Sequence, residues 1–416
     1  MPNSSRALDY PNFKWLLACV FCSTLGLQMQ VILVGQQLFD LTGDPLTLGL
    51  NGLFQALPAL SVALFAGTLV DSMDRKRLGL LAMMPTLLSV FGLWVLSSDM
   101  PWVHSWKVPS SFYALLVLNG LSRGFLSPTM FSLIGEILPK EAYQDSAGWN
   151  SIVWQGGTIV GPLLAGLLYS VIGPWWSFSI EFCLLCVGIF CFSQIKLPAC
   201  PWFRPGHSFA MPHLKQKISE GLNFVMSSPV LLSAFALDMM AVLFGGVEAI
   251  FPVFANDVFF TGPQGLGFLR AAPAAGSTLM AIVITQLPPM NYAGRWLIFA
   301  VAGFGISTMG FAMTSSFPLA LALLFIHGMF DQVSVVVRQS MTQILTPAEL
   351  KGRVASVRSI FIGMSNEIGA FESGLAAKYM GTIPSVIFGS SMTLIIAFGV
   401  GLKVKGLRHF KFREDG

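Results

Sequence analysis

Gly67-Thr-Leu-Val-Asp71-Ser-Met-Asp74-Arg75-Lys76-Arg77 is a short cluster of charge between two long apolar runs. The 416-residue chain as a whole is poor in charge: 11% of its residues are charged, 54% are hydrophobic, and the mean hydropathy is +0.70. Apolar runs of roughly 20 residues recur throughout, and each is long enough to cross a hydrocarbon core of about 30 Å as a helix. A membrane β-barrel would alternate apolar and polar residues, and this chain does not. The cluster is therefore predicted to be a short loop between two helices of an all-α membrane protein.

The apolar runs predict twelve membrane spans. Their approximate ranges are 13–39, 46–70, 78–97, 112–135, 146–172, 174–194, 229–256, 263–287, 294–314, 316–345, 353–379 and 382–402. Lys and Arg concentrate in alternate loops and in the C-terminal tail, which predicts that both termini are cytoplasmic. The first residues are polar and lack the pattern of a cleaved signal peptide, so none is expected.

The longest predicted loop, 195–228, divides the spans into two groups of six. Its second part, around 211–226, has the pattern of an amphipathic helix lying on the membrane surface, with Lys215 and Lys217 on its polar face. The predicted domains are an N-terminal six-helix bundle over 1–194, a linker over 195–228, a C-terminal six-helix bundle over 229–402 and a basic cytoplasmic tail over 403–416.

The two halves resemble each other when they are aligned at an offset of 208 residues. The match runs from the fourth predicted span into the fifth, and from the tenth into the eleventh. It superposes Gly120 on Gly328, Pro139 on Pro347, Glu141 on Glu349, Gly161 on Gly369, and Gly166 on Gly374. Such an internal repeat predicts two pseudo-symmetric bundles and a transport site at the interface between them.

The opening cluster allows two interpretations. A bare run of basic residues would mark only a cytoplasmic loop. The preceding Gly67 and Asp71 favour a gating contact instead, because a carboxylate at a helix boundary can cap a neighbouring helix or pair with Arg75 or Lys76. Such a contact would hold the cytoplasmic helix ends together in one state of the protein.

The fifth span contains Gly157-x-x-x-Gly161-Pro162-x-x-Ala165-Gly166. Small residues at this spacing allow close helix packing, and Pro162 bends the helix. The pattern could serve packing alone, or it could permit the movement of a gate.

Both patterns resemble motifs of the major facilitator superfamily. Residues 67–76 are similar to its Gly-x-Leu-x-Asp-Arg-x-Gly-Arg-Lys loop, although Ser72 and Asp74 depart from the usual Arg and Gly, and the corresponding loop of the second half, 288–295, is eroded. Residues 157–166 are similar to its antiporter motif, which is found mainly in proton-coupled exporters. The second half resembles the branch that contains the enterobactin exporter and macrolide efflux pumps. The segments that carry this resemblance are Val247-Glu248-Ala-Ile-Phe-Pro252-Val-Phe-Ala255, Gly265-x-Gly267-x-Leu-Arg270-Ala-Ala-Pro273-x-x-Gly276, Asp331 to Ser340, Thr346 to Val357, and Ser365 to Gly374.

The resemblance covers nearly the whole chain. It implies a transporter of siderophores or other bulky amphipathic molecules in a bacterial inner membrane, driven by the proton gradient and using no cofactor. It does not identify the substrate.

Ionisable side chains at membrane depth are costly and are therefore candidates for function. The carboxylates in the second half outnumber the arginines, so some of them are expected to be protonated during a transport cycle. The candidates for proton coupling are Asp238, His327, Asp331, Glu367 and Glu372.

Span ten carries His327, Asp331 and Arg338 at steps of four and seven residues, so all three lie on one helical face. In one interpretation Asp331 carries a proton and Arg338 adjusts its affinity. In the other the stripe is a static ion pair. For His327 alone a structural role is favoured.

The depth of each charged residue in the membrane, judged from its position within a predicted span, also predicts its partner. Glu248 and Arg270 lie in the outer parts of spans seven and eight and are expected to pair, whereas Asp238 lies near the level of Arg338 and Arg358. Arg123 in span four resembles the arginine of that span in antiporters. It could also bind an anionic group of the substrate, because Arg suits carboxylates and catecholates.

The function that these patterns favour is proton-coupled export of a siderophore or similar amphipathic molecule by alternating access. The alternatives are siderophore import, multidrug or macrolide efflux, lipid flipping and a non-transporting membrane sensor. An enzyme is not expected, because no nucleophile–base set, phosphate loop or metal-ligand cluster is present. The Cys19/Cys22 and Cys183/Cys186 pairs are interpreted as packing residues. The expected partners are the bilayer and a small, amphipathic, anionic substrate, with no nucleic acid and a monomeric chain.

Overall fold

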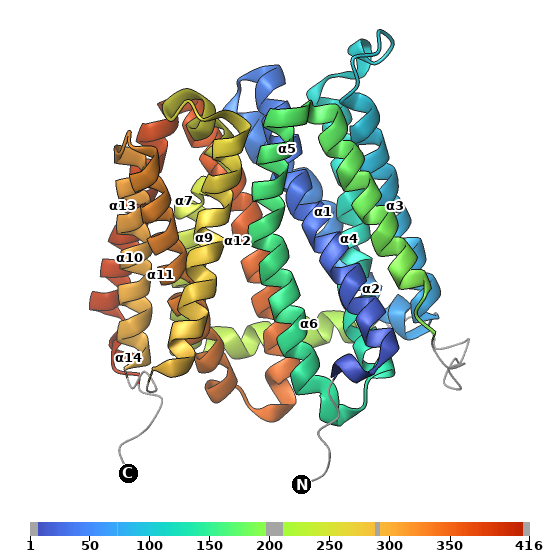
Figure 1. Cartoon of the computed structure of the whole chain (residues 1–416). Coiled ribbons are helices and arrows are strands. Elements are labelled where there is room, and N and C mark those ends of the chain that lie inside the picture. The colour runs from blue at the N-terminus through green and yellow to red at the C-terminus, as the bar shows by residue number, and fades with distance from the viewer. Residues whose placement is uncertain (1–6, 73, 197–210, 288–291, 411–416) are drawn as a thin grey trace. The chain divides into compact units, whose positions relative to one another are not determined.

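The structure is a computed structural model that describes residues 7–72, 74–196, 211–287 and 292–410 (Figure 1). All regular structure in these ranges is helical, and no strand occurs among them. Eight helical segments in the described ranges are long and apolar enough to cross a membrane, and one of them, Asp145–Ser193, is long enough for two spans. Three further helices of 28, 29 and 30 residues also have spanning length. The chain is an all-α membrane protein with twelve transmembrane helices in two six-helix bundles.

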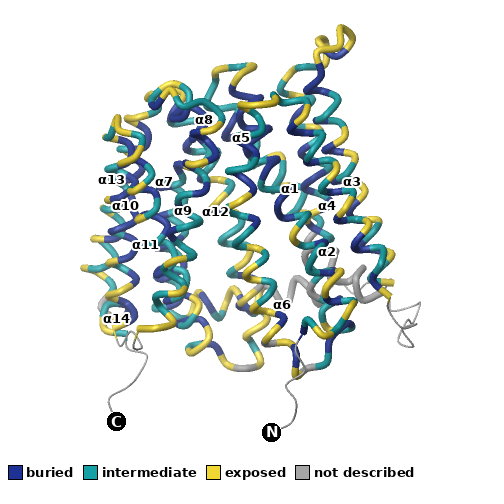
Figure 2. The backbone as a smooth tube through the Cα atoms, in the orientation of Figure 1, coloured by how far each residue is buried: buried dark blue, intermediate teal, exposed yellow. Residues whose placement is uncertain are grey.

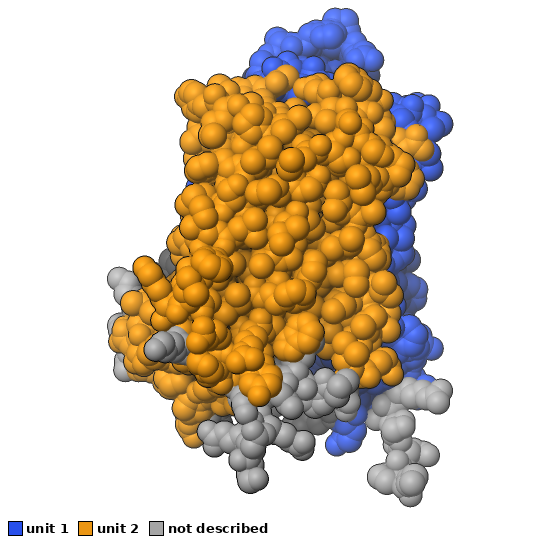
Figure 3. Space-filling model, turned by 90° about the vertical axis from the view of Figure 1, so that its left-hand side faces the viewer, with its two compact units in different colours: residues 1–42, 54–209 blue, residues 43–53, 210–416 orange. Residues whose placement is uncertain are grey.

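The chain forms two compact units, which are coloured separately in Figure 3. The first contains residues 1–42 and 54–209, and the second contains residues 43–53 and 210–416. Residues 43–53 therefore belong to the second unit, although they precede most of the first in sequence.

The first unit is built from five long helical segments and three short 3₁₀ turns. They are η1 (Ala7–Asp9), α1 (Pro11–Thr42), α2 (Pro45–Ser72, which belongs to this unit from Phe54 onward), α3 (Arg75–Leu96), η2 (His104–Trp106), α4 (Pro109–Ile137), η3 (Lys140–Ala142) and α5 (Tyr143–Ser193). Helix α1 packs mainly on α5, and α3 packs on α4 and α5. Buried residues recur along the length of these helices, as the dark segments of Figure 2 show.

Helix α5 consists of two helices joined at Gly173. This residue has φ +78° and ψ 173°, whereas the residues on either side are helical. A residue with a side chain rarely adopts this conformation, so glycine permits the break. The predicted boundary between spans five and six, at 172–174, coincides with it.

The second unit contains the remaining helices. They are α6 (Met211–Ser227), α7 (Pro229–Gly245), η4 (Val247–Ile250), α8 (Phe251–Val253), the π-helical turn η5 (Phe254–Val258), α9 (Gly262–Gln286), α10 (Ala293–Met313), α11 (Phe317–Leu345), η6 (Ala348–Leu350), α12 (Lys351–Met380), α13 (Thr382–Lys403) and α14 (Lys405–Arg408). Helix α11 packs between α9 and α10, and α12 and α13 both pack on α7.

Span seven is not one regular helix. Helix α7 ends at Gly245, Gly246 leaves the helical region with ψ 66°, and the chain continues to Val258 through η4, α8 and η5. The glycine pair explains the interruption, since glycine is a poor helix former. As a result Glu248 lies just after the break and not within a continuous helix.

Candidate functional site

The charged cluster at the start of α3 is organised by Asp74. Its carboxylate accepts hydrogen bonds from the backbone amides of Lys76 and Arg77, at 2.9 and 3.1 Å, and so caps the first turn of the helix. The sequence comparison treated Asp74 only as a departure from glycine. Its position directly before a helix that starts with three basic residues is a signal that could have revealed the cap.

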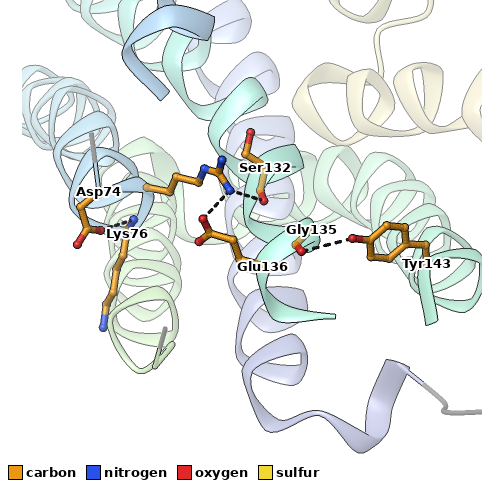
Figure 4. Close-up of polar contacts among 7 residues, drawn as sticks. Asp74, Lys76, Ser132, Gly135, Glu136 and Tyr143 are labelled. Carbon is orange, nitrogen blue, oxygen red and sulfur yellow. Dashed lines mark hydrogen bonds and ion pairs between the residues drawn. The ribbon is translucent and has the colours of Figure 1, made fainter. Parts of the chain in front are cut away.

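The basic side chains that follow bind α3 to its neighbours, as Figure 4 shows for the contact with α4. The Arg75 guanidinium lies 2.5 Å from the Glu136 carboxylate and 3.5 Å from the Ser132 carbonyl, both on α4. Lys76 donates from Nζ to the carbonyl of Ser193, at the end of α5, over 2.7 Å. Glu136 was not among the sequence candidates. The surroundings of Gly67 and the side chain of Asp71 lie outside the described part of the structure, so a contact made by Asp71 stays a prediction.

The glycines of the fifth span lie against α1. A Cβ atom added at Gly157 would be 2.7 Å from the Thr24 Cγ2, and one added at Gly161 would be 2.7 Å from the Gln28 Cβ. Both glycines and Pro162 are buried. The small residues therefore permit close contact between α1 and α5, which is the packing role expected from their spacing.

Arg123 on α4 is exposed, and its guanidinium donates to the side-chain oxygen of Gln55 on α2 over 2.6 Å. One turn earlier, the buried Asn119 donates to the side chain of Gln30 on α1. The first unit thus carries an accessible arginine within a group of amide side chains. This arrangement could bind a polar or anionic group.

In the second unit the predicted pair of Glu248 and Arg270 is confirmed. Their charged groups lie 2.8 Å apart, and Arg270 also donates to the Glu248 carbonyl at 3.3 Å. The two side chains are 45% and 25% exposed, so water screens the pair in part. It joins the break in span seven to the first turns of α9.

A second ion pair, between Asp238 on α7 and Arg338 on α11, is much more deeply buried. The two side chains are only 10% and 7% exposed. Arg338 also donates from Nε to the Ser334 carbonyl at 3.2 Å. The position of each residue within its predicted span placed Asp238 at the level of Arg338. The interpretation of His327, Asp331 and Arg338 as one helical face instead gave Asp331 as the partner of this arginine. The structure pairs Arg338 with Asp238.

This ion pair borders a small cavity between α7, α11 and α12, with space for about one water molecule. Its walls are formed by Phe235, Asp238, Met239, Arg338, Arg358, Phe361 and Ile362. The Nε of Arg358 is buried and has no hydrogen-bond partner among the described residues. The cavity is therefore apolar around a centre of three charged groups.

The remaining residues of the α11 stripe have different surroundings. His327 is buried, its Nδ1 lies 2.8 Å from the Thr308 hydroxyl, and its ring lies 4.1 Å from that of Phe304. These contacts with α10 match the structural role favoured for His327. Asp331 is half-buried and lies within electrostatic range of Arg338 and Asp238.

The two glutamates of α12 lie in the part of the second unit that includes residues 43–53. The Glu367 carboxylate contacts Gly52 of α2, and Glu372 is half-buried one and a half turns further along α12. A Cβ added at Gly49 would lie 2.9 Å from the Ala370 carbonyl, so glycine allows α2 to approach α12 closely.

The same region contains an ion pair that sequence analysis missed. Lys378 Nζ, at the end of α12, lies 2.6 Å from the Asp44 carboxylate, which also accepts from the Leu46 amide at 3.0 Å. Burial alone would raise the pKa of Asp44, but the hydrogen bonds from Lys378 and Leu46 and the Lys378 charge lower it overall. The sequence Asp44-Pro45 at a helix start is a visible signal for a cap. The ion-pair partner of Asp44, Lys378, lies 334 residues away in sequence.

Twelve membrane-spanning helices in two bundles, with charged groups buried among them, define a multi-pass membrane transporter and not an enzyme. No group of His, Cys, Asp and Glu residues able to hold a metal ion occurs in the described ranges. The chain belongs to the Major Facilitator Superfamily, whose family model matches residues 16–370.

Individual relatives are distant. The chain is 22% identical over 415 residues to the enterobactin exporter EntS of Escherichia coli (strain K12), covering 98% of this chain and 95% of the exporter. It is 27% identical over 349 residues to the multidrug efflux pump Tap of Mycolicibacterium fortuitum, covering 82% of each chain. Among solved structures, a bacterial homologue of the human lysosomal transporter Spinster, in an inward-facing and unoccupied conformation, matches with a TM-score of 0.72 at 14% identity, covering 94% of this chain and 96% of that one. These matches support the fold and leave the substrate open.

Proposed function

We propose that this protein is a proton-coupled exporter of an anionic siderophore or a similar bulky amphipathic molecule. The observation that carries the proposal is the buried ion pair between Asp238 and Arg338, which joins α7 to α11 at membrane depth. Removing one charge of such a pair costs several kcal/mol, because the other charge is left buried without a partner. A proton is the smallest ligand that can remove the charge of Asp238.

The ion pair couples protonation to conformation in the following way. When Asp238 binds a proton, Arg338 loses its counter-charge, and the protein favours any conformation that gives Arg338 water or another anion. When the proton leaves, the pair forms again and the first conformation returns. Asp331 is close enough to share this role, and Glu367 and Glu372 form a second group of carboxylates on α12. A ligand shifts a conformational equilibrium only by binding one state better than another, and the proton meets that condition here.

Substrate and direction are inferred from other features. Arg123 offers an exposed guanidinium for an anionic group. Two relatives carry names that state export, an enterobactin exporter and a multidrug efflux pump. The glycine-proline pattern of the fifth span, with its packing on α1, is compatible with the same direction.

The proposed setting is the bacterial inner membrane, with both termini cytoplasmic, a monomeric chain and the proton gradient as the only energy source. Gly67, Asp71, Arg75 and Lys76 would then form a cytoplasmic gate. The contact between Arg75 and Glu136 would hold α3 and α4 together there.

The test is transport into proteoliposomes with an imposed pH gradient. Vesicles that are acidic inside should accumulate a catecholate siderophore as protons leave, and the rate should fall to background when the gradient is collapsed. Asp238→Asn should abolish the response to the gradient. The control Asp99→Asn removes a carboxylate that is 96% exposed and should leave the response unchanged.

Two results would contradict the proposal. One is that the wild type moves no siderophore, macrolide or lysolipid faster than vesicles without protein. The other is that Asp238→Asn and Asp331→Asn both leave gradient-driven transport intact. Movement in the opposite direction under the same gradient would instead identify an importer.

Multidrug efflux is the second candidate, and the identity of 27% with the Tap pump favours it. The same vesicles decide between the two, because a multidrug pump would accumulate macrolides at least as fast as a siderophore. Selective movement of lysolipids would identify a flippase.

A further inference from the structure

A buried carboxyl group in the first unit takes no part in the features described above. Glu181 lies near the middle of the second helix of α5, between the break at Gly173 and the end of the helix at Ser193. The residue is 0% exposed, and neither carboxyl oxygen has a hydrogen-bond partner among the described residues. Buried polar atoms are normally hydrogen-bonded, so two unpartnered oxygens on one carboxyl group require an explanation.

The Glu181 side chain lies against α1. A Cβ atom added at Gly26 would be 3.8 Å from the Glu181 Cγ and 3.4 Å from the Leu185 Cδ2. One turn further along the same face of α1, the buried Gln30 accepts a hydrogen bond from Asn119 of α4. Both of these side chains are uncharged amides, and each keeps one polar atom without a partner among the described residues. They therefore cannot balance a negative charge on Glu181.

The charged and titratable groups on the helices packed against α5 lie elsewhere. These helices are α1 and α3. Arg75 and Lys76, in the first turn of α3, bind α4 and the end of α5, and Arg123 on α4 is exposed and binds Gln55. The other titratable side chains of α1, α3 and α5 are Lys14, Cys19, Cys22, Asp40, Arg77, Tyr143, Asp145, Tyr169, Cys183, Cys186 and Cys191. No charged side chain among the described residues is within electrostatic range of Glu181.

We propose that Glu181 is a proton-binding site of the first unit, which carries a proton in this conformation and exchanges it only when α1 and α5 loosen their packing. An ionised carboxylate at membrane depth is costly, above all where no counter-charge and no hydrogen bond is available. A bound proton removes the charge and adds almost no volume, so the neutral acid fits the existing packing. Loss of the proton favours a conformation in which water reaches the carboxylate.

Close packing between α1 and α5 restricts the exchange of this proton. In addition to the contact at Gly26, a Cβ atom added at Gly161 would be 2.7 Å from the Gln28 Cβ and 3.1 Å from the Leu25 carbonyl. These contacts lie within one turn of Gly26 along α1, so water can reach Glu181 from this side only if the two helices separate. Separation of the helices and loss of the proton therefore favour each other.

Infrared spectroscopy of the purified full-length protein, in detergent micelles without ester groups, tests for the proton directly. At neutral pH the wild type should show the carbonyl stretch of a protonated carboxylic acid, and Glu181→Gln should lose part of that band. Asp99→Asn, which removes an exposed carboxylate, should keep the whole band. Glu181→Met, of similar length and without a carboxyl group, takes the place of Glu181→Gln if the latter does not fold.

The rate at which the same band shifts in heavy water reports how often water reaches Glu181. In the wild type the Glu181 part of the band should shift slowly. Gly161→Ala places a methyl group against α1 and should speed the shift, whereas Gly156→Ala, which meets open space, should leave the rate unchanged.

The pH dependence of unfolding counts the same proton independently. In mixed micelles with dodecyl sulfate, the unfolded chain releases the Glu181 proton at pH values where the folded chain retains it. The ratio of the wild-type unfolding constant to that of Glu181→Gln should therefore rise about tenfold per pH unit between about pH 6 and 8. The proposal is wrong if this ratio does not change with pH, if Glu181→Gln leaves the infrared band unchanged, or if Gly161→Ala does not speed its shift. Neither measurement uses a substrate or a gradient, so both are independent of the transport test.

Discussion

Removing one partner of the Asp238–Arg338 ion pair should destabilise the protein much more than removing both. The side chains are 10% and 7% exposed, so water can hardly solvate a charge that is left alone there. Breaking a pair of this kind costs about 3–5 kcal/mol, whereas replacing both partners with uncharged residues of similar size is often close to neutral. Asp238→Asn and Arg338→Gln should each lower the free energy of unfolding by about that amount, and the double substitution by far less.

The measurement is a double-mutant cycle in phosphate-free buffer, with reversible unfolding in mixed micelles of detergent and dodecyl sulfate followed by circular dichroism. The expected coupling energy is at least about 3 kcal/mol. The Glu248–Arg270 pair in the same unit is the matched control. Its side chains are 45% and 25% exposed, so its cycle should give no more than about 1 kcal/mol. Additive effects of Asp238→Asn and Arg338→Gln, or equal coupling in the two cycles, would show that burial does not control this pair.

Three further predictions concern other parts of the structure. Asp74→Ala removes the cap of α3 and should cost about 0.5–2 kcal/mol of unfolding free energy, whereas Asp74→Ser should retain most of it. Gly161→Ala places a methyl group against α1 and should cost about 1–3 kcal/mol by thermal unfolding, but Gly156→Ala, which meets open space, should be neutral or slightly stabilising. The pKa of Asp44 is lower in the folded state than in the unfolded state. Its ionised carboxylate therefore stabilises the folded state above the unfolded pKa, and this stabilisation is lost as pH falls through the folded pKa. Asp44→Asn and Lys378→Gln should each remove this part of the acid-dependent loss of stability.

Much of the fold could be predicted because each span carries its own signal. The boundary near Gly173 and the pairing of Glu248 with Arg270 were both accessible, since the first depends on local sequence and the second joins the ends of consecutive spans. The partner of Arg338 could not be predicted from the sequence in this way. Periodicity within α11 pointed to Asp331, but the arrangement of α7 beside α11 brings Asp238 closer, and that arrangement is a property of the whole bundle.

The contacts of the charged loop show the same limit. Asp74 is a local cap, so a search for helix starts could have found it. The pairing of Arg75 with Glu136 joins residues 61 positions apart, and nothing in the sequence near either residue specifies the other. Lys378 and Asp44 are still further apart. Residue type and depth in the membrane thus identify the charged residues that form ion pairs. Their partners depend on which helices become neighbours in the fold.

Helix α2 has a mechanical property that follows from its composition. Its first residues, to Leu53, belong to the second unit, and the residues from Phe54 onward belong to the first. Pro58 lies inside the same helix and has no amide hydrogen, so the carbonyl of Phe54, one turn earlier, lacks its usual partner. The interruption in the hydrogen bonding of α2 therefore coincides with the change from one unit to the other. Bending at this point breaks fewer backbone hydrogen bonds than bending elsewhere in the helix, so α2 bends most easily between Phe54 and Pro58.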